Sequence, residues 1–107
     1  MGNKIKGMII AVILAATSNV VFAGGSTFDD GVVAFIKGDG QTAYSIWKPL
    51  ADKGNKEAQY YLGYMFQTGT GVHVDRTKAL YWYHKAAKNG HGKALILAQV
   101  LERQMKH

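Results

Sequence analysis

The chain repeats itself, and this internal repeat restricts the possible folds more than any other feature of the sequence. Residues 39–63 can be slid by 36 positions onto residues 75–99, and small and aromatic residues then coincide. The coinciding pairs are Asp39 and Asp75, Ala43 and Ala79, Trp47 and Tyr83, Ala51 and Ala87, Gly54 and Gly90, and Ala58 and Ala94. A period of roughly 30–40 residues is typical of solenoids built from stacked helix–turn–helix units.

The composition is that of one small globular domain that is stabilised by packing alone. The chain has 107 residues, of which 48% are apolar, and this allows a single core. It has no cysteine, which excludes disulfides and thiolate metal sites. Beyond residue 23 it carries 11 Lys and Arg against 7 Asp and Glu. This small excess does not indicate nucleic-acid binding.

Residues 1–23 have the pattern of a secretory signal peptide. A short basic start is followed by an uncharged apolar run over 7–16 and by small residues that end at Ala23. The apolar run is shorter than the ~20 residues that span a bilayer. We therefore expect cleavage between Ala23 and Gly24, and an exported bacterial protein, periplasmic or secreted, without a stable membrane anchor. An uncleaved N-terminal anchor is the alternative interpretation.

The rest of the chain shows the apolar period of α-helices. Apolar residues recur at i, i+3, i+4, i+7 and i+8, which places each set on one helix face. We expect an all-α chain with five helices at about 27–37, 41–53, 56–68, 76–89 and 92–106.

Local signals mark the ends of these helices. Asp39 and Asp75 can cap the helices that follow them, and Thr27 with Asp30 has the spacing of a capping box. Glycines 54 and 90 follow helix ends, where left-handed backbone is favoured. Pro49 cannot donate a backbone hydrogen bond to Ser45, so we expect a kink there and not a break.

The stretch 58–98 carries a dense set of family signatures. They are Ala58-Gln59, Leu62-Gly63, Gly69-Thr70-Gly71-Val72, Asp75, Lys78-Ala79, Trp82-Tyr83, Lys85-Ala86-Ala87 and Gly90. With these residues the chain resembles the Sel1-like repeat family, which is related to the tetratricopeptide repeat. Residues 31–62 resemble a degenerate first repeat with a shorter loop.

The resemblance implies a short right-handed α-solenoid of antiparallel helix pairs. Its parts are a degenerate first repeat at about 27–55, a second repeat at about 56–91 and a capping helix at about 92–106. The resemblance also implies a scaffold that binds other proteins in envelope or secretion pathways. The expected partner is a protein or a peptide.

No catalytic or metal-binding motif stands out. His84 and His91 are separated by a helix end at Gly90, and neither has an acidic neighbour in the sequence, so we expect surface histidines. Residues 69–71 follow a helix and lack the lysine of a phosphate loop, which indicates a turn. We therefore expect no enzyme activity, no cofactor and no metal.

Two alternative functions stay open. One is an enzyme-like envelope protein that acts on cell-wall fragments. The other is an assembly subunit that caps a larger repeat array or forms a homodimer. The C-terminal helix favours the second, because its residues 95–101 are apolar on most sides.

A partner-binding groove is the main site hypothesis. Two apolar pairs lie opposite the core stripes of their helices at positions 36 residues apart, and Phe28 with Val32 takes the equivalent place in the first helix. In a solenoid these helices line the concave surface, although the pairs can also pack against one another. We expect a mainly apolar partner with some acidic character towards its C-terminal end. The candidate groove residues are Tyr60, Tyr64, Ile96, Val100, Glu57 and Arg103.

Overall fold

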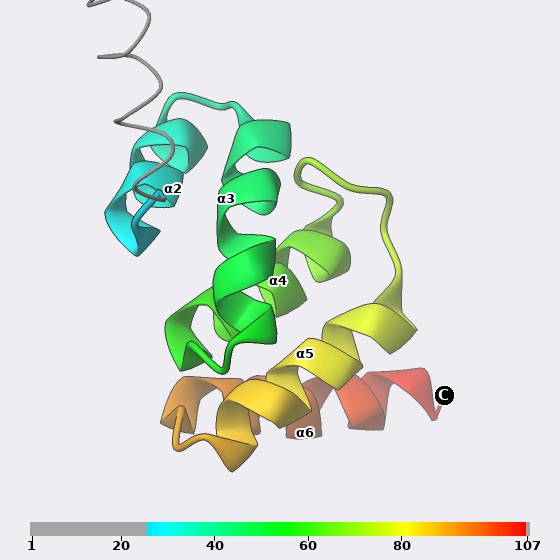
Figure 1. Cartoon of the computed structure of the whole chain (residues 1–107). Helices are drawn as coiled ribbons and strands as arrows, with labels where there is room; N and C mark the ends of the chain where they lie inside the picture. The colour runs from blue at the N-terminus through cyan, green and yellow to red at the C-terminus, as the bar shows by residue number, and fades with distance from the viewer. Residues whose placement is uncertain (1–25, 107) are drawn as a thin grey trace, which may run out of the picture.

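The computed structural model describes residues 26–106, and all the regular structure in this range is helical (Figure 1). The five helices are α2 (Phe28–Ile36), α3 (Gly40–Asp52), α4 (Lys56–Thr68), α5 (Arg76–Lys88) and α6 (Gly92–Met105). Every helix end lies within one residue of the predicted position. The expected cleavage between Ala23 and Gly24 falls outside the described residues.

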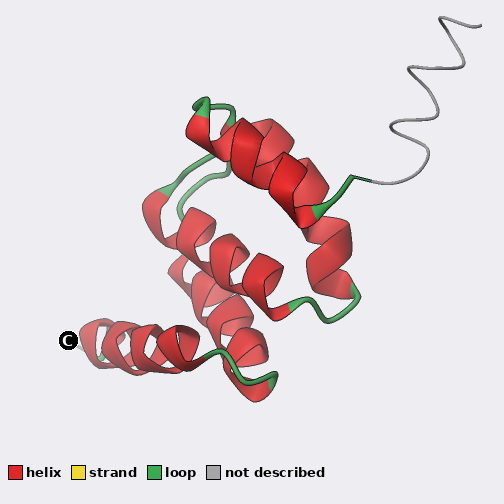
Figure 2. Cartoon of the chain, turned by 90° about the vertical axis from the view of Figure 1, so that its left-hand side faces the viewer, coloured by secondary structure: helices red, strands yellow, loops and turns green. Residues whose placement is uncertain are grey.

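Each helix packs against the next one in the chain. The contacts run from α2 to α3, α3 to α4, α4 to α5 and α5 to α6, and Figures 1 and 2 show this sequential stacking. The helices form antiparallel pairs, which confirms the predicted all-α fold as a short solenoid. Within residues 26–106, no helix has the length and apolarity needed to cross a membrane.

The predicted helix ends are made by the expected residues. Thr27 and Asp30 form a reciprocal capping box on α2, and Asp39 and Asp75 cap α3 and α5 by accepting backbone hydrogen bonds. Pro49 lies inside α3 without breaking the helix. The helix ends are therefore local features of the sequence, because each cap acts within one turn of its own helix.

The core depends on glycines that let aromatic rings approach the backbone. A Cβ on Gly31 would overlap the ring of Trp47, and a Cβ on Gly63 would overlap the ring of Tyr83. Both aromatic side chains are fully buried, and so is Ala79. The same glycine–aromatic contact therefore occurs in both helix pairs, and it makes Gly63 a close-packing position between α4 and α5.

Candidate functional site

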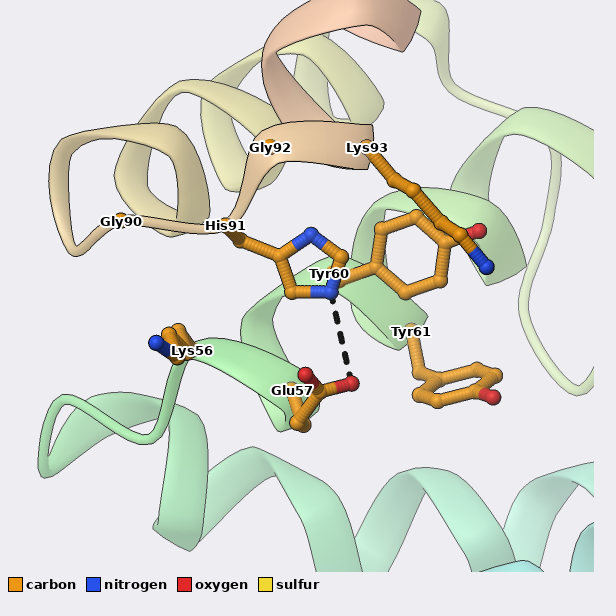
Figure 3. A pocket seen from close by; sticks show the side chains of 8 residues that line it. All are labelled: Lys56, Glu57, Tyr60, Tyr61, Gly90, His91, Gly92 and Lys93. Carbon is orange, nitrogen blue, oxygen red and sulfur yellow. Dashed lines mark hydrogen bonds and ion pairs between the residues drawn. The ribbon is translucent and has the colours of Figure 1, made fainter.

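A crevice opens between the first half of α4 and the start of α6 (Figure 3). It consists of two cavities, of about 300 Å³ and about 160 Å³, that share Tyr60 and Lys93. We call it the Tyr60 crevice. Its lining residues are Lys56, Glu57, Tyr60, Tyr61, Gly90, His91, Gly92 and Lys93 in the larger cavity, and Tyr60, Lys93, Ile96 and Leu97 in the smaller one.

The ring of Tyr60 is held in place by other rings. It stacks on His91 with a centroid separation of 4.4 Å and an interplanar angle of 10°. The ring of Tyr61 meets it edge-on at 5.1 Å, and that of Tyr83 lies at 6.0 Å. Because Tyr60 is fixed on several sides and half-buried, it presents a preformed apolar surface to the crevice.

His91 joins α4 to α6. Its Nδ1 accepts a hydrogen bond from the backbone N–H of Ala94 at 3.2 Å, so the side chain caps α6. The ring proton must then lie on Nε2, which is 3.3 Å from Oε1 of Glu57 on α4 and donates to it. Only 8% of His91 is exposed.

The expectation of a surface histidine is therefore wrong for His91. The acidic neighbour that the sequence lacks is Glu57, which lies 34 positions away in the chain and is brought close by helix packing. His84 is exposed as expected, but its Nε2 lies 3.6 Å from Oε1 of Glu102. The repeat offered a signal for His91, because a shift of 36 positions places it on Asn55, the cap of α4.

The crevice carries an excess of positive charge. Lys56 and Lys93 both line it, whereas its one carboxylate, Glu57, already interacts with His91. Lys93 also lines the smaller apolar cavity together with Ile96. The arrangement can therefore hold an aliphatic group beside an anion.

The structure brings some of the predicted groove residues together and separates others. Tyr60 and Ile96 line one cavity. Tyr64 is 38% exposed and meets Phe35 edge-on at 6.1 Å, towards α2. Val100 is 37% exposed on α6. Glu57 lines the crevice but interacts with His91, and Arg103 lies in a separate depression with Gln99, Glu102 and Lys106.

The equivalent space between α2 and α4 is filled. Phe28 stacks on Trp47 at 5.3 Å, and the ring of Phe35 lies 6.1 Å from that of Tyr61. Tyr61 itself stacks on Trp47 at 4.8 Å. The space between α4 and α6 is therefore open, whereas aromatic residues fill the space between α2 and α4.

The tyrosine behind the crevice is a structural group. Burial raises the pKa of Tyr83 far above its usual value, so its hydroxyl remains protonated and donates to Oε1 of Gln67 at 2.6 Å. Within the part of the chain that the structure describes, no three His, Cys, Asp or Glu side chains lie close enough together to hold a metal ion.

Comparison with known proteins identifies the repeat. Residues 56–91 match the Sel1 repeat family. The chain is 40% identical over 53 residues to "Chitin synthase regulatory factor 4" of Schizosaccharomyces pombe, a match that covers 50% of this chain and 8% of that protein. It is 41% identical over 56 residues to "Chitin synthase regulatory factor 3" of the same yeast, with 52% and 6% covered.

A plant protein is similar over a longer stretch. The chain is 31% identical over 74 residues to the "ERAD-associated E3 ubiquitin-protein ligase component HRD3A" of Arabidopsis thaliana, which covers 68% of this chain and 11% of that protein. The chain thus spans between 6% and 11% of the length of these curated relatives. No solved structure matches it significantly.

Proposed function

Since this chain belongs to the Sel1-repeat family, we propose that it is an exported, non-catalytic scaffold that binds a partner protein or peptide in the Tyr60 crevice. Sel1 repeats are generally binding modules that mediate protein interactions. The names of the relatives fit this role, because they describe regulatory factors and a component of a ligase. The pattern of residues 1–23 supports the proposed export.

The observation that carries the proposal is the open apolar surface beside Tyr60. Ile96 is 59% exposed next to the smaller cavity, and Val100 is exposed one turn further along α6. Apolar side chains grouped on a concave surface are stabilised when a partner covers them. The repeat fold leaves this surface open on the α4–α6 side.

The surface chemistry of α6 favours the crevice as the binding site over a further helix. Gln99 lies 36 positions after Gly63, which in α4 packs directly under the ring of Tyr83. The exposed side chain of Gln99 would prevent a further helix from approaching that face of α6 as closely. Glu102 also lies on this face, and its exposed apolar residue is Leu95. The side that carries Ile96 and Val100 is more apolar.

Charge complementarity defines the partner segment. Lys56 and Lys93 attract a carboxylate, while the smaller cavity accepts an aliphatic side chain between Tyr60 and Leu97. We propose a segment in which an aliphatic residue lies close to an acidic one. Buried apolar contact then supplies most of the affinity, and the lysines supply orientation and specificity.

Selection from a random peptide library on the full-length chain tests this proposal. The expected peptides pair an aliphatic residue with an acidic one. Ile96→Asp should reduce their binding at least tenfold, because it places a charge in the apolar cavity. Lys93→Glu should weaken binding less, through repulsion of the acidic residue.

Val33→Asp is the matched control for this experiment. Val33 is 50% exposed on α2, does not line the crevice, and receives the same charge. The Val33→Asp variant should bind the selected peptides as tightly as the parent does. Peptides that bind Ile96→Asp as well as they bind the parent would overturn the crevice as the site. A parent that sediments as a dimer, and becomes monomeric in Ile96→Asp, would favour self-assembly.

A further inference from the structure

The two helices that form the Tyr60 crevice are capped by different chemistry at equivalent positions. Asn55 caps α4 by accepting from the N–H of Ala58 at 2.9 Å. His91, 36 positions later, caps α6 by accepting from the N–H of Ala94 at 3.2 Å. An asparagine amide does not titrate in water, whereas an imidazole changes charge between about pH 5 and 8.

The cap on α6 requires a neutral ring. Nδ1 of His91 accepts from Ala94 with its lone pair, and a protonated imidazole has no lone pair left on either nitrogen. Protonation would therefore turn the acceptor into a donor that faces another donor. It would also place a positive charge at the N-terminus of a helix, where the dipole is already positive.

The groups around the ring act in both directions. From α4, the carboxylate of Glu57 and the face of Tyr60 favour a positive ring, and Lys56 disfavours it. From α6, Lys93 also disfavours it.

Two further contacts complete the surroundings of the ring. Tyr61 is the other titratable residue in the lining, and α5 contributes the backbone oxygen of Ala86, which accepts from the N–H of His91 at 2.9 Å. The carboxylate of Glu57 is half exposed, so its attraction is screened by water. Protonation therefore removes the lone pair that caps α6, while the contact between Nε2 and Glu57 remains.

We propose that His91 regulates the Tyr60 crevice through its protonation state. In the neutral state it caps α6, stacks on Tyr60 and holds the start of α6 against α4. Protonation releases the cap, loosens the first turn of α6 and weakens partner binding at acidic pH. The effect on partner binding rests on the proposed function, whereas the effect on α6 does not.

Nuclear magnetic resonance of the ¹⁵N-labelled full-length chain tests the effect on α6 without any partner. At pH 7.5 the ring proton of His91 should lie on Nε2. On lowering the pH to 5.0, the hydrogen-exchange protection of the Ala94 amide, corrected for intrinsic rates, should fall roughly fivefold as the cap is lost. The Ala58 amide, which Asn55 caps, should keep its protection and serves as the internal control.

His91→Asn is the matched variant, because it transfers the cap of α4 to α6. It should keep Ala94 protected and abolish the dependence on pH. The proposal is overturned if His91 stays neutral down to pH 5.0 or carries its proton on Nδ1 at pH 7.5. It also fails if His91 titrates without a change at Ala94, or if His91→Asn retains the same pH response.

Peptides from the library selection test the link to binding. Their affinity for the parent should fall several-fold between pH 7.5 and 5.0, and their affinity for His91→Asn should fall less, because both proteins meet the same peptide carboxylates. Equal losses would overturn the link. The two proposals can fail separately. If exchange at Ala94 contradicts the cap proposal, the binding of peptides to Ile96→Asp still tests the crevice. If Ile96→Asp binds peptides as the parent does, exchange at Ala94 still tests the cap.

Discussion

The α2–α4 junction and the α4–α6 junction are built from equivalent positions, yet one is filled and the other is open. In the first, Tyr61 stacks on Trp47 and closes the space against Phe28. In the second, Leu97 lies 36 positions after Tyr61 and takes the equivalent place in the repeat. The smaller cavity opens between Leu97 and Tyr60. The exchange of Tyr61 for Leu97 thus contributes to the difference between the filled junction and the open one, together with Phe35, which packs against Tyr61 on the α2 side.

The comparison teaches that successive units of a repeat can fill the space between their helices to different extents. The filled junction buries its rings and contributes stability through area and aromatic contacts. In the open junction, apolar surface next to Lys93 stays exposed to water and therefore does not contribute in this way. A partner that binds as proposed would cover this surface.

The largest expected effect comes from removing the centre of the filled junction. Trp47 is fully buried, and its Nε1 donates to the backbone oxygen of Phe28 at 3.0 Å. Trp47→Ala should lower the free energy of unfolding by about 3–5 kcal/mol, measured by chemical denaturation. Tyr60→Ala in the open junction should cost clearly less, because one side of its ring faces the crevice. Equal losses would mean that the two junctions do not differ in packing.

A smaller effect is expected from overpacking the helix pair behind the crevice. Gly63→Leu forces a side chain into the ring of Tyr83 and should destabilise the chain by about 1–3 kcal/mol. Gly92→Ala is the control, since nothing lies within 4 Å of the added Cβ. Thermal melts should show a loss for Gly63→Leu alone. Identical melting temperatures for Gly63→Leu and the parent would contradict the close contact between α4 and α5.

The smallest effect on stability is expected from converting the open junction into the filled one. Leu97→Tyr imports the residue of the α2–α4 junction into the cavity and should change stability by only about 0.5 kcal/mol, because the cavity has room for the ring. Binding of the selected peptides should be lost.

The reverse substitution completes this test. Tyr61→Leu should open the filled junction and cost about 1–2 kcal/mol, because it removes ring contacts with Trp47 and Phe35. Peptide titrations and thermal melts of both variants provide the measurement. Retained binding in Leu97→Tyr would show that the smaller cavity is not where the partner binds.

The sequence by itself determined the helices and their stacking order. Periodic apolar residues and caps such as Asp39 and Asp75 act within one or two turns, so they are visible without any tertiary contact. The 36-residue repeat also predicted the solenoid, since each unit can bury its apolar face only against a neighbour.

The tertiary structure alone decided which space between the helices is open and which is filled. Tyr60 and Ile96 were expected to lie together, and they line one cavity, but the closure of the α2 side by Phe35 and the position of Arg103 outside the crevice did not follow from the period. Helix periodicity gives the face on which a side chain lies. It does not give the depth at which a neighbouring helix meets that face.

The surroundings of His91 likewise could not be predicted from helix periodicity. Its alignment with Asn55 offers a signal for a cap, but the contacts with Glu57 and Tyr60 arise only because the start of α6 meets the first turns of α4. Burial, hydrogen bonding and nearby charge set the chemistry of an imidazole, and all three depend on residues that are distant in the chain. The sequence therefore determined where the helices are, and their packing decided which surface is open and which histidine is buried.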